Sequence, residues 1–363
     1  MPQPYAVHRP VAPGRARRLR WVAACVTLLA VAACSSTPSG SEPSGGGPSA
    51  TGGGATSAAA ATSLAKPAAT GPIGSPADLA VLDTISVGTA TSGTAPSLAL
   101  ASKPISVSTT SRKVLIPGSG EPSTLRGLVR AEILFVKGSD GTVLDSTYGR
   151  APQSLELNPD RPILSGLAIG LAGLPVGARA LVAIPPAQGF GASGRPDLGI
   201  SATENLVMVA DILAVSTAIP MATGTTVAPL AGAPTVAFDP AKGPTITIPA
   251  GVAAPTTLVN QTLIEGSGPK IVEGMAVQVH YTGVLWKDGS VFDSSWTRGT
   301  FFGFPTGAGA VIPAWDTGLL GHTVGSRIML IVPPADGYGP SGSPPKISGT
   351  DTLVFVIDIL ASA

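Results

Sequence analysis

The side chains that could carry chemistry in this chain are mainly aromatic. Only 4% of the 363 residues are aromatic, yet aromatic residues crowd into the segment from Tyr281 to Trp315. Such a cluster indicates either an apolar binding pocket or an ordinary core, because aromatic side chains are normally buried. Both interpretations apply to single rings such as Phe304 and Phe355. A pocket role is favoured for Tyr338, which stands between two glycines in a proline-rich loop.

Three other kinds of site are disfavoured. The chain has 3 histidines, and once His8 leaves with an N-terminal leader, His280 and His322 alone cannot form a typical multi-histidine zinc site. No Ser/His/Asp arrangement has a credible third member. The G-x-G-x-x-G segments at 189–194 and 337–342 are followed by proline, whereas a nucleotide-binding fingerprint needs a helix there. We therefore expect no metal and no cofactor.

The N-terminus predicts an exported protein. Arginines among the first twenty residues precede an apolar run at 21–33, which is shorter than the roughly 20 residues that span a bilayer. The segment 31–34 (Val-Ala-Ala-Cys) resembles a bacterial lipobox, which implies lipidation at Cys34; the alternative is a signal anchor whose cysteine stays a thiol. We expect anchoring at the outer face of the cytoplasmic membrane. Without the leader the chain is mildly acidic and has no basic surface for nucleic acid.

The chain contains one kind of domain twice. The segment 114–120 (VLIPGSG) matches 262–268 (TLIEGSG), and 140–146 (DGTVLDS) matches 288–294 (DGSVFDS), each at an offset of 148 residues. The ends of the two copies pair at an offset of 147, after a single deletion. Internal similarity of this kind indicates a duplicated unit.

Composition places the boundaries of these units. The N-terminal region is rich in Gly, Ser, Ala, Pro and Thr and too poor in large apolar residues to form a core. We predict five parts: a lipoprotein signal peptide at 1–33, a low-complexity tether at 34–83, a degenerate first copy at 84–216, a linker at 217–231 and a second copy at 232–363.

Each copy is expected to be mostly β-structure with one short helix. The segment 275–281 alternates between apolar and polar residues, and 353–360 is a β-branched closing strand. A helix is expected from Pro313 or Ala314 to Leu320, with proline in an acceptable first-turn position.

Read in order, the second copy gives VQVHYTGVLWKDGSVFDSSWTRG, GAGAVIPAWDTGLLGHTVGSR, IVPPADGYGPSG and DTLVFVIDIL. Over about 100 residues with many fixed spacings, it closely resembles the FKBP-type peptidyl-prolyl cis/trans isomerase family. The resemblance implies an α+β fold in which a bent antiparallel sheet wraps a short helix and leaves a hydrophobic slot for a proline ring. It implies catalytic roles for Tyr281, Phe292, Asp293, Trp315, Tyr338 and Phe355, and substrate-binding roles for Arg298, Phe302, Phe304, Val311, Ile312 and Ile347.

Within that set, Trp315 would form the floor, Tyr338 and Asp293 would lie at the rim, and the Ile312 N–H would hold a substrate carbonyl. Asp293 could equally be a turn cap, and Arg298 a solvated ion-pair partner. The implied function is isomerisation of X-Pro bonds in proline-containing exported polypeptides, with macrolides as further ligands. The alternative is a module that binds proline-containing or unfolded chains without turning them over, or a chaperone-like surface lipoprotein.

The first copy departs from the family pattern at the aromatic positions. Asp145 and Arg150 are kept and Phe190 replaces Tyr338, but at five matching positions the aromatic ring is lost: Ile133, Leu144, Ser154, Leu167 and Met208. We expect this copy to keep the architecture but to be weakly active or inactive, as a spacer, chaperone surface or docking module.

Overall fold

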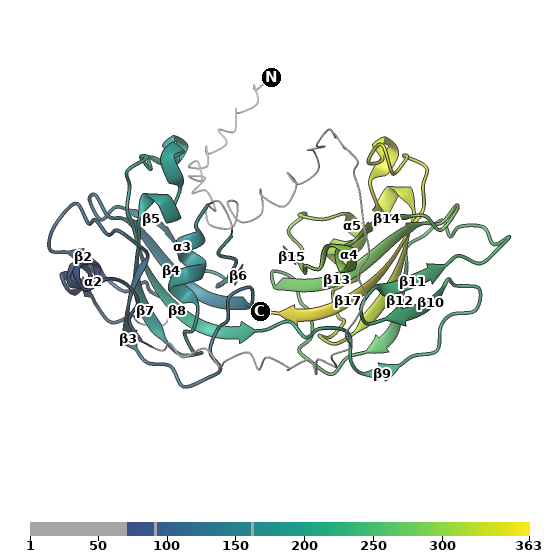
Figure 1. Cartoon of the computed structure of the whole chain (residues 1–363), viewed down its shortest axis with the longest axis horizontal. Helices are drawn as coiled ribbons and strands as arrows, with labels where there is room; N and C mark the ends of the chain where they lie inside the picture. The colour runs from purple at the N-terminus through teal and green to yellow at the C-terminus, as the bar shows by residue number, and fades with distance from the viewer. Residues whose placement is uncertain (1–70, 91–92, 161–162) are drawn as a thin grey trace, which may run out of the picture.

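The computed structural model describes residues 71–90, 93–160 and 163–363; the predicted signal peptide, Cys34 and most of the predicted tether lie outside these ranges. Two lobes stand side by side, with the C-terminus between them (Figure 1). Each lobe is built on one antiparallel sheet.

The sheet of the first domain and its core helix have these bounds: β3 (Ser111–Ile116), β4 (Leu128–Lys137), β5 (Val143–Ser146), β6 (Gln153–Glu156), α3 (Ser165–Leu171), β7 (Arg179–Ile184) and β8 (Leu206–Ser216). Those of the second domain are β9 (Thr225–Thr226), β12 (Val259–Glu265), β13 (Ala276–Leu285), β14 (Val291–Ser294), α4 (Ser295–Arg298), β15 (Phe302–Pro305), α5 (Pro313–Gly318), β16 (Arg327–Val332) and β17 (Leu353–Ser362). The strand order is β3-β7-β8-β4-β5 with β6 on β4 in the first domain, and β14-β13-β17-β16-β12-β9 with β15 on β13 in the second. The predicted α+β fold with two similar domains is confirmed.

The duplication extends to irregularities of the strands. The pairing of β4 with β8 shifts register between Arg130 and Ala131, and the pairing of β13 with β17 shifts between Gln278 and Val279, at the same place in the repeat. Such shifts bend a strand and increase its twist. They help curve each sheet around its helix.

A carboxylate in the first turn of helix α5 fixes the loop that precedes the helix. It begins at Pro313, as expected, and ends at Gly318, two residues before the predicted end. The Asp316 carboxylate accepts N–H groups of Gly307 and Gly309, both at 2.8 Å, which fixes the preceding loop. Trp315 lies on the inner side of the helix and is 4% exposed.

Both faces of each sheet are covered. The inner faces pack on α3 and α5. The outer face of the first sheet packs against α2 (Pro76–Asp83), β1 (Ile85–Val87) and β2 (Leu98–Leu100), and that of the second against the hairpin of β10 (Thr235–Asp239) and β11 (Gly243–Thr247). No helix among the described residues is long and apolar enough to cross a membrane.

The prediction that the tether runs as far as residue 83 is wrong for its last part. Ser75 caps α2 by accepting the Asp78 N–H at 3.1 Å, and Pro76 occupies the first turn. Asp78 accepts hydrogen bonds from the Ser108 N–H and hydroxyl, and Leu82 is fully buried. These contacts stabilise the helix on the first domain.

Much of the predicted linker also belongs to the second domain. The N–H groups of Ile219 and Thr223 donate to the carbonyls of Leu360 and Gly325, and β9 pairs with β12. Between the domains, Gln278 Nε2 donates to the Arg126 carbonyl at 2.6 Å. The chain therefore joins the domains through an ordered, hydrogen-bonded connection.

Candidate active site

The aromatic side chains singled out in the second copy meet around Trp315. The centroid of its ring lies 4.9 Å from that of Tyr281, 5.2 Å from Phe355, 5.7 Å from Phe304 and 5.9 Å from Phe302. Three of these contacts are edge-to-face, the arrangement that aromatic quadrupoles favour. Strands β13, β15 and β17 supply the walls and α5 supplies the floor.

Phe292 extends this cluster over a glycine that leaves room for its ring. Its ring contacts Phe355 edge-to-face at 5.4 Å. Between them stands Gly283, where an added Cβ would lie 2.5 Å from the Phe292 ring and 3.0 Å from Phe355. Gly283 was not among the predicted site residues; its only signal is its place on the Tyr-Thr-Gly strand, and its importance depends on packing across two other strands.

One edge of the cluster is polar. The Tyr281 hydroxyl donates to Asp293 and accepts a hydrogen bond from the Arg298 guanidinium at 3.0 Å, while Arg298 also pairs with Asp293. Burial, together with the hydrogen bond to Asp293, raises the pKa of Tyr281, so the hydroxyl stays protonated in neutral and mildly basic solution. Asp293 thus positions Tyr281 and Arg298 rather than capping a turn alone.

The remaining predicted residues complete the site from neighbouring loops. Ile347 is buried within the cluster, and Val311 and Ile312 are half-buried against it. Lys346, which was not predicted, donates from Nζ to the Phe292 carbonyl at 2.8 Å and ties the rim loop to β14. Tyr338 lies between two turns of 3₁₀-helix and is 42% exposed.

Two hydrogen-bond donors in this site have no acceptor within the described residues. The indole Nε1 of Trp315 is buried without a partner, which costs about 1–3 kcal/mol for a neutral group. The backbone N–H of Ile312, at the start of α5, makes no hydrogen bond within the same residues. Ile312 is only half-buried, so its N–H is available to a ligand.

His280 belongs to a different cluster. Its ring stacks on Trp296 at 4.2 Å and its Nδ1 lies 2.8 Å from the Ser295 hydroxyl oxygen. Burial lowers the pKa of His280, which favours the neutral imidazole. This supports the interpretation of His280 as a packed strand residue.

The equivalent place in the first domain is filled differently. Ile133, Leu167 and Met208 are buried in its core. Phe135 occupies the position of Gly283, opposite Met208 on β8. The ion pair between Arg150 and Asp145 persists, but Ile133 has no hydroxyl to join it.

Comparison with known proteins finds the same family in both domains. The family model described as FKBP-type peptidyl-prolyl cis-trans isomerase matches residues 130–210 and 268–360. The FK506-binding protein of Streptomyces anulatus is 43% identical over 119 residues, which is 95% of that protein and 32% of this chain. The probable FK506-binding protein of Corynebacterium glutamicum is 43% identical over 119 residues, covering 98% of its length and 33% of this chain. Among solved structures, the three FKBP domains of wheat FKBP73 match 70% of this chain and 94% of that chain, at 21% identity and a TM-score of 0.29.

The chain belongs to the FKBP-type peptidyl-prolyl cis-trans isomerase family. It is a peptidyl-prolyl cis-trans isomerase with two matching regions, one in each domain. The family and enzyme class predicted from sequence are confirmed, while the roles of individual site residues stay predictions.

Proposed function

We propose that the second domain carries the isomerase activity and that the first domain contributes little or none. The observation that carries this proposal is the complete aromatic cluster around Trp315. In the first domain, Leu167 takes the place of that indole. A pure scaffold would have no need to keep the cluster in one copy alone.

The proposed mechanism needs no nucleophile. Resonance holds an X-Pro amide planar with a rotation barrier of roughly 18–20 kcal/mol. The proline ring enters between the aromatic walls, and the Ile312 N–H donates to a substrate carbonyl. An apolar slot disfavours the charge-separated planar amide relative to the twisted amide, in which resonance is lost. The barrier falls without any covalent bond.

The test compares two tryptophan variants in a prolyl-isomerisation assay on tetrapeptides. Trp315→Leu copies the residue of the first domain, and Trp296→Leu is the matched control, because Trp296 stacks on His280 outside the cluster. We expect Trp315→Leu to lose at least about 90% of kcat/KM, equivalent to about 1.4 kcal/mol or more in the barrier, and Trp296→Leu to retain activity. The remaining activity of a folded Trp315→Leu chain also sets an upper limit on what the first domain contributes.

The alternative from a different class is a binding module that holds proline-containing chains. A wild-type chain that binds such peptides without accelerating isomerisation would establish it. Inhibition by FK506, lost in Trp315→Leu, would support macrolide binding in the same slot.

We further propose that the protein is exported and anchored by a lipid on Cys34, and that it assists the folding of exported polypeptides. This rests on the lipobox-like segment 31–34. Metabolic labelling with palmitate should mark the wild type and Cys25→Ala, since Cys25 lies in the leader, but not Cys34→Ala. Label that persists in Cys34→Ala would refute the anchor.

A further inference from the structure

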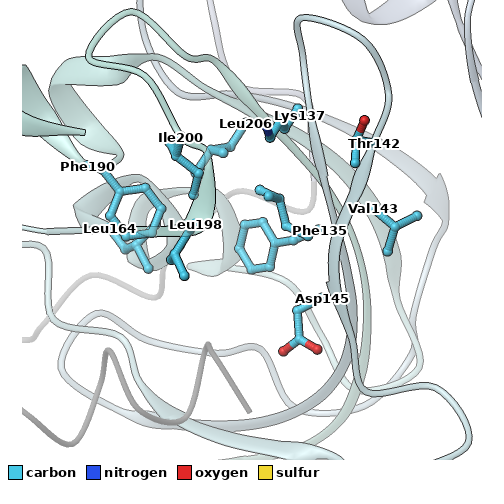
Figure 2. Close-up of a pocket in the computed structure, with 11 residues that line it drawn as sticks. Phe135, Lys137, Thr142, Val143, Asp145, Leu164, Phe190, Leu198, Ile200 and Leu206 are labelled. Atoms are coloured by element: carbon cyan, nitrogen blue, oxygen red, sulfur yellow. The ribbon is translucent and has the colours of Figure 1, made fainter. Parts of the chain in front are cut away.

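The first domain contains a cavity that the proposed isomerisation does not use. Its volume is about 190 Å³. It lies between β4, β5 and the loops around Leu164, Phe190 and Leu198, and Figure 2 shows the side chains that line it. The walls are largely apolar: Phe135, Leu144, Leu164, Phe190, Leu198 and Ile200.

Differences between the copies at two places account for this space. Leu144 stands where the second domain has Phe292, so a ring is replaced by a smaller side chain. In the second domain, Lys346 bridges from Nζ to the Phe292 carbonyl at 2.8 Å. The matching loop of the first domain is one residue longer and has Leu198 and Gly199 there, neither of which can make that bridge.

The cavity stands where the second domain has its proline slot. Among its lining residues, Leu144, Leu164, Phe190 and Ile200 match Phe292, Ile312, Tyr338 and Ile347. The counterparts of the other slot residues, Ile133, Leu167 and Met208, are 2%, 5% and 0% exposed and do not line it. Phe135, which replaces Gly283, is 3% exposed and does line it. The cavity is therefore a changed form of the slot, without the indole that forms the floor in the second domain.

Polar groups stand at two edges of the cavity. In Figure 2, Lys137 and Asp145 lie at opposite ends of the apolar lining. Asp145 Oδ1 accepts from Arg150 and from the Ser146 N–H, whereas Oδ2 accepts no hydrogen bond within the described residues. An ammonium at one end and a carboxylate oxygen at the other would suit the carbonyl and N–H groups of an extended backbone that crosses the mouth.

We propose that this cavity binds one leucine-, methionine- or phenylalanine-sized side chain of an extended polypeptide. A dry cavity of about 150 Å³ lined by Leu, Ile and Phe is large enough for benzene, so about 190 Å³ accommodates one such side chain. The first domain would then hold a client chain by a bulky apolar residue, while the second acts on its prolines. The inference rests on the proposed function only in taking polypeptides as ligands.

The experiment uses the full chain with methyl-labelled Ile, Leu and Val, titrated with blocked pentapeptides Ala-Ala-X-Ala-Ala. With X as Leu or Phe, methyl signals of Leu144, Leu198 and Ile200 should shift, with affinity at least about tenfold above that for X as Ala. With X as Pro, affinity at this site should match that of the Ala peptide.

Two variants alter the cavity lining. Leu144→Phe restores the residue of the second copy and fills the cavity, and Leu198→Lys places a charge in its apolar wall; each should weaken binding of the Leu peptide about tenfold or more. Leu213→Ala, at a position that is 45% exposed on β8, is the control and should bind normally.

Prolyl-isomerase activity is measured on the same samples and should be unchanged in all three variants. The inference is overturned if the first-domain methyl signals report tighter binding of the proline peptide than of the Leu peptide. It is also overturned if a folded Leu144→Phe or Leu198→Lys chain binds the Leu peptide as the wild type does. A wild-type chain without isomerase activity would instead overturn the proposed function, because the peptide titration does not depend on isomerase activity.

Discussion

Removing the Tyr281 hydroxyl tests whether the polar edge of the aromatic cluster assists the reaction. Tyr281→Phe keeps the ring against Trp315 but deletes the donor to Asp293 and the acceptor for Arg298. Hydrogen bonds to charged groups contribute about 1.5–3 kcal/mol when buried. The Asp293 and Arg298 side chains are 39% and 46% exposed, so solvent screening reduces the expected loss to about 1 kcal/mol.

If that interaction is needed equally in the transition state, kcat/KM on tetrapeptides should fall about fivefold. Tyr148→Phe in the first domain is a matched control. Tyr148 is 8% exposed, against 7% for Tyr281, and its hydroxyl donates to Asp211 at 2.8 Å beside Arg179. It should lose a similar or larger free energy of unfolding without losing activity.

The pH dependence gives a second readout. Burial raises the pKa of Tyr281, so its hydroxyl does not ionise between pH 7 and pH 10 and wild-type kcat/KM should show no tyrosine titration there. Unchanged activity in Tyr281→Phe, or an equal drop in Tyr148→Phe, would show that the polar edge supports the fold alone.

Three further outcomes are expected. Arg112→Met should lower the unfolding free energy by about 2–4 kcal/mol in urea titrations, because buried backbone carbonyls lose a charged donor. Burial lowers the pKa of Arg112 to about 10, so the side chain is charged at pH 7. An unchanged unfolding free energy would contradict this expectation. Burial lowers the pKa of His280 and His322 below 6.5, so the unfolded chain binds more protons and stability should fall from about pH 7 towards pH 5, with a smaller slope in His322→Gln. Gly283→Ala places a Cβ against the Phe292 ring and should cost about 1–3 kcal/mol of stability with reduced kcat/KM, whereas normal activity would show that the ring moves freely.

Much of the fold was predictable because the repeat fixes the strands. Strands β4 and β13 lie 148 residues apart and have 10 residues each, as the matching segments indicate. What covers the outer faces was not predictable. Every residue of β17 is buried, and its continuous apolar run indicates that both faces of the sheet are covered. Nothing in the run specifies whether a helix or a hairpin covers the outer face.

The candidate site was also predictable only in part. The resemblance supplied the aromatic positions, and the structure brings Tyr281, Phe292, Trp315 and Phe355 into one cluster. It could not supply Gly283, because the space that this residue leaves open is defined by rings on β14 and β17. Contacts that cross strands far apart in sequence require the fold itself.

The two copies also separate what holds the fold from what performs the chemistry. Arg179 pairs with Asp211 through two hydrogen bonds of 2.6 and 2.7 Å, and Arg327 pairs with Asp358 through two of 2.6 and 2.8 Å. The Arg327–Asp358 pair is buried, and loss of one partner from such a pair costs about 3–5 kcal/mol, whereas the Arg179–Asp211 pair is partly exposed and the cost there is smaller.

Only the third donor to each carboxylate differs. It is the Tyr148 hydroxyl for Asp211 and the Ala222 N–H for Asp358, which ties the connection between the domains to the second sheet. The first domain keeps this pair although Leu167 stands where the second domain has Trp315, so the pair supports the fold with or without the aromatic cluster. The changed first-domain cavity is the place where a different ligand can be sought.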